Sequence, residues 1–148
     1  MYSLSFHGQQ TGLLSGTPPV LTPFAAPNLV DGIEIISFDG AGNLANLSLA
    51  VRNGASAAAG QSGLTANGFQ PQTGTYSVSS DCTGTGTFDQ PGMTATFGFV
   101  LGNDRKAIRL LVTSQHVAQI PNNPNCTAPA GCDTAVQINS VGEKVQGR

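Results

Sequence analysis

Charged residues are scarce in this chain. They account for 9% of its 148 residues, with six Lys and Arg against eight Asp and Glu. The cations are scattered apart from Arg105, Lys106 and Arg109, so the clustered positive charge that neutralises nucleic-acid phosphates is missing. Trp is absent, and no apolar run approaches the ~18–20 residues that a membrane-spanning helix needs. We therefore expect neither a nucleic-acid partner nor a membrane span.

Ser, Thr, Asn and Gln stand where many intracellular proteins carry Lys and Glu, a pattern common in exported proteins. No charged segment followed by an apolar run stands at Met1, as a signal peptide would require. We interpret the chain as the mature form of a secreted or periplasmic protein whose signal peptide is not part of this sequence. An intracellular protein of biased composition is the alternative.

Glycine and proline are abundant, at 19 and nine residues, which favours short strands joined by turns. Apolar residues alternate with polar ones in eight segments of strand length. The predicted strands are Tyr2–His7, Val30–Asp39, Leu44–Asn53, Gly74–Ser79, Thr83–Asp89, Met93–Leu101, Arg105–Gln115 and Thr134–Val141. The length of the chain suits one domain over residues 1–148.

Tight turns alternate with long connections along the chain. The predicted turns lie at 39–43, 80–82 and 102–104, and the long connections at 8–29, 53–73 and 116–133. In an up-and-down sheet every second connection lies at the same end, so the long loops would share one rim. The sequence therefore predicts a single eight-stranded antiparallel up-and-down β-barrel with a built-up mouth. A two-sheet β-sandwich is the alternative.

Two motifs carry a resemblance to a known group of proteins. They are Phe38-Asp-Gly-Ala-Gly-Asn43, and Gly74-Thr-Tyr-Ser-Val78 continued by Asp81-Cys-Thr-Gly-Thr85. The chain resembles small exported bacterial proteins of unassigned function that carry such motifs, over most of residues 1–115. Lys106-Ala-Ile108 and the 116–133 connection depart from the pattern of that group. The resemblance implies a compact barrel of the lipocalin-like or allene-oxide-cyclase-like type, and it implies no catalytic residue.

Several apolar side chains are predicted to form the core or to line a cavity. They are Leu49, Tyr76, Val78, Phe97, Phe99 and Leu110. Gly84 and Gly86 share one strand face, which indicates bending or the close approach of another side chain. Small barrels either fill with side chains or hold one small ligand, and the sequence leaves both open.

The two histidines, His7 and His116, end odd-numbered predicted strands, so we expect both at the mouth, together with Arg52. Either His could act as a general base or bind a ligand; the alternative is that both are exposed strand ends. The predicted ligand-binding residues are His7, Arg52, Phe69, Tyr76, Phe97, Phe99 and His116. Two His without a carboxylate at fixed spacing match no metal signature, so neither a metal nor a cofactor is expected.

Of the three cysteines, Cys126 and Cys132 lie in the last long connection, whereas Cys82 lies in a tight turn at the opposite end. Disulfide Cα atoms must lie within about 7 Å of each other, so we predict a Cys126–Cys132 bond and a free Cys82. Three reduced thiols in an intracellular protein are the alternative. The Asp residues of the turns, Asp39, Asp81 and Asp104, are expected to cap backbone NH groups.

Three functions remain compatible with the sequence. The first is binding of a small apolar or amphipathic molecule in the barrel cavity at the mouth. The second is a cyclase or isomerase that uses the same cavity. The third is a structural role in a homo-oligomer, favoured by the second strand, which carries Ile33 and Ile35 on one face and Ile36 and Phe38 on the other. Its outer face is expected to be covered, by a second subunit rather than by the 8–29 segment.

Overall fold

The computed structural model describes residues 1–56, 63–120 and 123–145, and these residues form β-strands joined by turns and loops. The strands are β1 (Tyr2–Ser15), β2 (Val20–Phe38), β3 (Asn43–Arg52), β4 (Ala55–Ser56), β5 (Gln70–Val78), β6 (Thr83–Gln90), β7 (Met93–Gly102), β8 (Ala107–Val117) and β9 (Cys132–Lys144).

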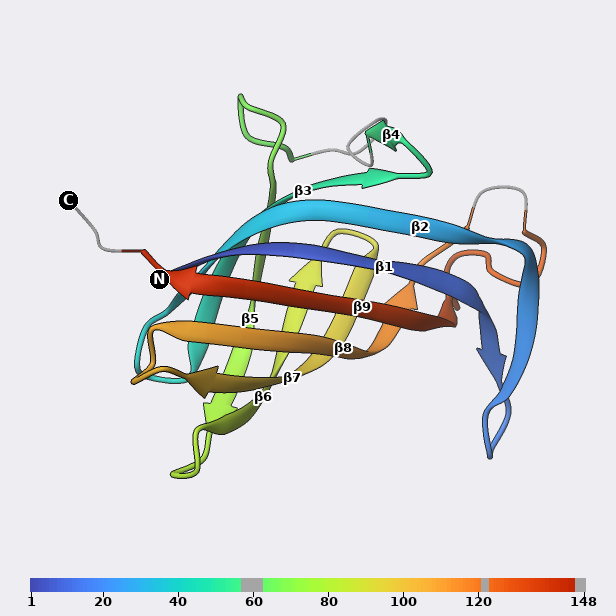
Figure 1. Ribbon diagram of the computed structural model, residues 1–148. Helices are drawn as coiled ribbons and strands as arrows, with labels where there is room; N and C mark the ends of the chain where they lie inside the picture. Colours follow the sequence, from blue (N-terminus) through green and yellow to red (C-terminus); the bar gives the residue numbers. More distant parts are fainter. Residues whose placement is uncertain (57–62, 121–122, 146–148) are drawn as a thin grey trace.

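All strand pairings belong to one antiparallel sheet that closes on itself (Figure 1). Following the pairings, β1, β2, β3, β5, β6, β7, β8 and β9 are neighbours in that order, and β9 pairs with β1 again. β4 is a short addition to the end of β3. The prediction of an all-β fold with eight antiparallel strands in up-and-down order is confirmed, and the strands form a barrel-like ring.

The connections divide between the two ends of the ring as the sequence predicts. Residues 39–42, 79–82 and 103–106 join strands at one end, which we call the turn end. Residues 16–19, 53–69, 91–92 and 118–131 join strands at the other, the loop end. Asp39 and Asp81 do cap their turns: Asp39 accepts hydrogen bonds from the backbone NH of Ala41 and Asn43, and Asp81 from that of Thr83. Hydrogen bonds from the side chains of Asn43 and Thr83, together with these backbone bonds, lower the pKa of the Asp39 and Asp81 carboxyl groups.

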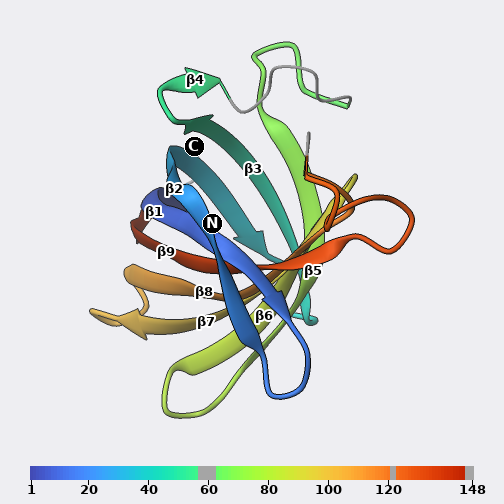
Figure 2. The same ribbon diagram turned by 90° about the vertical axis from the view of Figure 1, so that its right-hand side faces the viewer.

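The predicted long loop over 8–29 is wrong, because most of it is strand. β1 and β2 stay paired as far as Ser15 and Val20 and form a hairpin that bends away from the ring (Figures 1 and 2). The prolines in this segment had indicated a loop and not a strand, because proline lacks the NH that a central strand needs. However, β3 pairs with β2 only from Val30 onward, so residues 20–27 of β2 have no second neighbouring strand, and Pro27 lies in the stretch where the register with β1 is interrupted.

The turn-end half of the interior is filled by a cluster of aromatic and aliphatic side chains. Its buried members are Tyr2, Leu4, Ile36, Leu44, Phe88, Phe97, Phe99, Ile108 and Leu110, with Phe38 and Tyr76 packed against them. The rings contact one another: Phe38 packs edge-on against Tyr76 with centroids 4.7 Å apart, and Phe88 stacks on Phe97 at 4.3 Å. This cluster closes the turn end of the ring.

Gly84 and Gly86 make room for two of these rings. A Cβ atom at Gly84 would overlap the ring of Phe99, and one at Gly86 the ring of Phe97. The expected close approach of another side chain is therefore the correct interpretation, and the space beside β6 is occupied rather than empty.

β3 faces the opposite way from the expected one. Leu47, Leu49 and Val51 lie on the outside, and Asn46, Ser48 and Arg52 point inward. Leu49 is therefore not in the core, and Val78, which is exposed at the turn end, is not either. On the outer face, Ile33 pairs with Leu49 and Ile35 with Leu47. Ile33 is 52% exposed and Leu47 39%, so the outer faces of β2 and β3 form an apolar patch.

The glycine sites give a stability prediction. We expect Gly86→Ala to destabilise the fold by about 1–3 kcal/mol, because the added methyl overpacks the Phe97 ring. Gly98→Ala is the matched control on β7, since a Cβ there meets nothing closer than 3.9 Å. Urea denaturation of both variants measures the difference. Equal midpoints for the two variants would contradict the packing described here.

Candidate functional site

A cavity of about 110 Å³ lies inside the ring on the loop-end side of the aromatic cluster. Its lining comes from all eight strands of the ring: Phe6, Val30, Glu34, Ser48, Ala50, Arg52, Gln70, Gln72, Phe88, Gln90, Met93, Ala95, Leu110, Val112, Gln115, Ile138 and Ser140, together with Gly68. Part of the barrel interior is thus hollow, which the sequence left open.

The cavity has two chemically different walls. Six polar side chains from β2, β3, β5 and β6 form the polar wall: Glu34, Ser48, Arg52, Gln70, Gln72 and Gln90. Across the ring, β1, β7, β8 and β9 contribute the mainly apolar wall: Phe6, Met93, Ala95, Leu110, Val112 and Ile138, with Gln115 and Ser140 as its polar members. Val30, Ala50 and Phe88 are the apolar members of the other side, so a molecule in this space would meet mainly hydrogen-bonding groups on one side and mainly hydrocarbon on the other.

Hydrogen bonds connect the polar wall into a chain. The Nδ2 of Asn46 donates to Glu34 Oε2 at 3.0 Å and to Gln72 Oε1 at 2.7 Å. Gln72 Nε2 in turn donates to Gln90 Oε1. The Oδ1 of Asn46 is buried and has no hydrogen-bond partner among the described residues. A buried acceptor of this kind is unfavourable unless water or a ligand donates to it.

Glu34 is the one buried acid among the described residues that line the cavity. Burial raises the pKa of its carboxyl group, while hydrogen bonds from Asn46 and Ser140 partly offset that increase. The carboxyl group therefore keeps its proton to a higher pH than an exposed Glu. A protonated carboxyl facing a cavity can donate a hydrogen bond, or a proton, to a bound molecule.

Arg52 is the last residue of β3 and pairs with Val30. Of the predicted ligand-binding residues it is the one that lines the cavity. Burial lowers the pKa of its guanidinium group, and its Nε is buried without a hydrogen-bond partner among the described residues.

Three of the other predicted residues lie below the cavity. Phe97 and Phe99 are fully packed in the aromatic cluster. The hydroxyl of Tyr76 accepts a hydrogen bond from the backbone NH of Gly40, which fixes this ring at the turn end. Phe69 is half-buried, but the cavity is lined by its neighbours Gly68 and Gln70 instead.

The predicted meeting of the two histidines at the mouth is wrong. His7 lies halfway along β1, opposite Asp31 and Asn139, and is exposed on the outer face. His116 does lie near the loop end, but also on the outer face.

A β-bulge accounts for the outward orientation of His116. Against β7, the register of β8 shifts between Val112 and Ser114, which pair with Phe97 and Thr96, and the extra residue on β8 reverses which side chains face inward. Leu110 and Val112 point inward before the bulge, and Gln115 takes the inward position after it. His116 therefore points to solvent.

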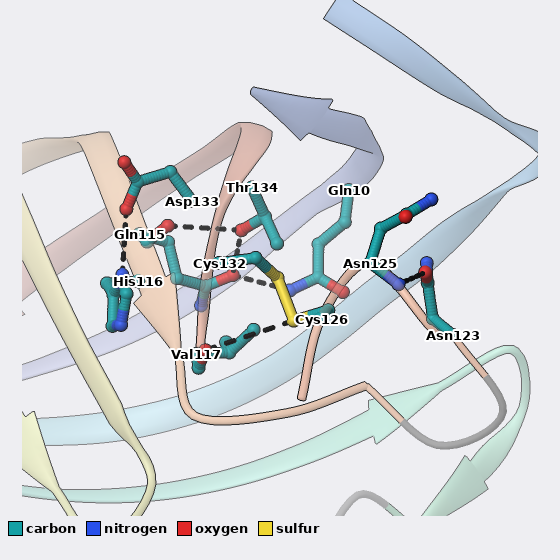
Figure 3. The surroundings of a disulfide bond; sticks show 10 residues. All are labelled: Gln10, Gln115, His116, Val117, Asn123, Asn125, Cys126, Cys132, Asp133 and Thr134. Carbon is teal, nitrogen blue, oxygen red and sulfur yellow. Dashed lines mark hydrogen bonds and ion pairs between the residues drawn. A yellow bond between two sulfur atoms is a disulfide. The ribbon is translucent and has the colours of Figure 1, made fainter. Parts of the chain in front are cut away.

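The disulfide between Cys126 and Cys132 is present, with Cα atoms 5.1 Å apart, and Cys82 is free. Figure 3 shows its surroundings. The bond holds the 118–131 connection against the start of β9, where Asp133 pairs with His116 at 2.8 Å. On the inward side Thr134 Oγ1 donates to Gln115 Oε1 at 3.0 Å. The disulfide thus shapes the loop end beside the cavity.

The polar wall was missed from the sequence, although part of its signal was present. Glu34 lies two residues before Ile36 and therefore on the same strand face as that core residue. Gln70 and Gln72 alternate in step with Tyr76 and so lie on the same strand face, but Pro71 and the nearby glycines are typical of a loop. The inward position of Asn46 requires knowing that β3 turns its apolar face outward, whereas Arg52 was predicted from its place at the end of a strand.

Among the described residues, no three His, Cys, Asp or Glu side chains come together as metal ligands. No helix there is long and apolar enough to cross a membrane. No protein-family model, curated protein or solved structure matches this chain.

Glu34 gives a pH-dependent prediction. Its pKa in the folded state is raised above the ordinary value of 4.5, so the unfolded chain loses this proton at a lower pH than the folded protein does. Ionisation of the buried carboxyl group therefore lowers the free energy of unfolding. This destabilisation is absent below pH 4.5 and develops as the pH rises toward the folded-state pKa. We expect Glu34→Gln to raise the Tm at about pH 8, by roughly 2–4 °C for each kcal/mol recovered, and to have little effect near pH 4.

The matched control for this prediction is Glu143→Gln, at an exposed position of β9. Thermal unfolding followed by circular dichroism at both pH values measures the effect. A Glu34→Gln variant that loses stability at the higher pH would contradict the assignment, because it would mean that the ionised carboxylate stabilises the fold.

Proposed function

We propose that this protein binds a small amphipathic molecule in the cavity between the polar and apolar walls. The observation that carries the proposal is the inward polar face of β3 and β5. These strands place Ser48, Arg52, Gln70 and Gln72 inside a closed ring, where core packing alone would favour apolar side chains.

The orphaned polar atoms support the same proposal. Asn46 Oδ1 and Arg52 Nε are the two buried side-chain atoms without a hydrogen-bond partner among the described residues. Arg52 lines the cavity, so a ligand with an acceptor group would satisfy its Nε, whereas Asn46 lies six residues away on β3 and is not part of the cavity lining. The apolar wall would pack against its hydrocarbon part. The small volume favours a ligand of only a few carbon atoms over one of lipid size.

NMR titration with hexan-1-ol tests this proposal. We expect amide and methyl signals of the cavity lining, such as Val112 and Ile138, to shift in a saturable manner. Ala50→Leu, which fills part of the cavity from β3, should weaken binding about tenfold or more, because it removes space that the ligand needs.

The control is Ala45→Leu, which adds the same atoms on the outer face of β3 and should bind as the parent does. Native mass spectrometry of the freshly purified protein provides a second measurement, since a small molecule retained from the cell would also be released on unfolding. Signals that stay unchanged up to millimolar alcohol, with no retained molecule, would refute the proposal.

A structural role through self-association is the second candidate, favoured by the apolar patch on the outer faces of β2 and β3. The hairpin formed by residues 8–29 does not bury this patch, since Ile33, Ile35, Leu47 and Val51 are exposed. We propose a second copy of the chain as the occupant. Two copies of this patch can face each other across a twofold axis, with apolar residues on both sides and few charges to separate.

We expect light scattering to detect a dimer at micromolar concentration, and the double variant Ile33→Ser, Leu47→Ser to be monomeric. Val100→Ser, at an exposed position of β7 away from the patch, should leave the dimer intact. A monomeric parent protein at these concentrations would exclude self-association through this face.

A further inference from the structure

We infer that the ligand of the cavity is a small organic anion, a short-chain monocarboxylate, whose carboxylate binds the Arg52 guanidinium. This inference rests on the proposed binding function and specifies the chemical class of the ligand. It starts from the position of Arg52, which ends β3 beside Val30 and lines the cavity at its loop-end side.

Arg52 is a half-buried cation without a counter-charge among the described residues. No acidic side chain lies within ion-pair distance of it among residues 1–56, 63–120 and 123–145, and its Nε has no hydrogen-bond partner there. Guanidinium groups stay charged under all ordinary conditions. Burying such a charge without a partner is costly, whereas an anion that accepts its NH groups offsets the cost.

Glu34 does not supply this anion. On the sheet it lies opposite Ser48, four residues before Arg52 on β3, which corresponds to about 13 Å along the strand. Its carboxyl group is engaged by Asn46. Arg52 and Glu34 therefore occupy separate positions along the polar wall, with the glutamines of β5 beside them.

The form of the guanidinium group and the walls of the cavity select the class of anion. A planar fork of NH donors matches a carboxylate through two parallel hydrogen bonds. The neighbouring Val30 and the facing Val112 and Ile138 provide an apolar surface for a hydrocarbon chain. An inorganic anion would satisfy Arg52 but leave that surface uncovered. The volume of about 110 Å³ limits the chain to a few carbons.

The test compares hexanoate with hexan-1-ol, which has the same chain length but no charge. Both are titrated by NMR while the Nε–H signal of Arg52 is observed directly. We expect hexanoate to bind at least about tenfold more tightly, as charge-assisted hydrogen bonds allow, and to shift that signal. In Arg52→Gln, the preference for hexanoate over the alcohol should disappear.

Arg109→Gln removes the same charge from the exposed face of β8 and should leave both affinities unchanged. Arg52→Lys keeps the charge but loses the planar fork, so it should retain a reduced preference for the acid. If Arg52→Gln does not fold, the affinities of Arg52→Lys for the acid and the alcohol test the inference instead.

The outcomes separate the inference from the function on which it rests. Equal affinity of the parent protein for the acid and the alcohol overturns the inference but leaves small-molecule binding intact. Absence of binding for both refutes the proposed function as well. An equal loss of acid affinity in Arg109→Gln and Arg52→Gln would assign the preference to the overall charge of the protein, and would also overturn the inference.

Discussion

The hydrogen bonds between β1 and β9 are the constraint on which the rest of this structure depends. They join the first and last strands of the chain, from the pair Tyr2 and Lys144 to the pair Leu14 and Asp133. With this pairing the sheet becomes a closed ring, and the part of β2 before Val30 has an open edge outside it. Closure also separates an inside from an outside, so each strand residue has one of two environments, set by its parity.

The interior is divided along the axis of the ring. At the turn end, aromatic rings take the space left by Gly84 and Gly86 and pack against one another. Toward the loop end, the inward positions of β3 and β5 are polar and the interior is hollow. The packed part stabilises the fold, because buried apolar area is its main favourable contribution. This allows the other part to keep a buried acid, a half-buried cation and a chain of hydrogen-bonded amide side chains that a small core would otherwise exclude.

The polar interior and the apolar exterior of β3 have one cause. Leu44 is buried at the start of the strand, so the residues that alternate in step with it also face inward, namely Asn46, Ser48 and Arg52. The residues between them face outward, among them Leu47, Leu49 and Val51. The same reversal therefore underlies the proposed ligand site inside and the proposed self-association face outside. Both proposals supply a partner from outside the single chain: an anion for Arg52, and a second apolar surface for Ile33 and Leu47.

The sequence by itself determined the all-β class, the up-and-down order, the two kinds of end and the Cys126–Cys132 bond. These follow from local features, namely alternation, turn residues and the distance between opposite ends of a strand. Only the tertiary structure decided which face of each strand points inward. A bulge in β8 turned His116 outward and Gln115 inward, and the open edge of β2 allowed prolines within a strand. Arg52 was predicted from its place at the end of a strand. The inward positions of Glu34, Asn46 and Gln72 became known only from the closed ring, because the burial of a polar side chain depends on neighbours that are distant in the sequence.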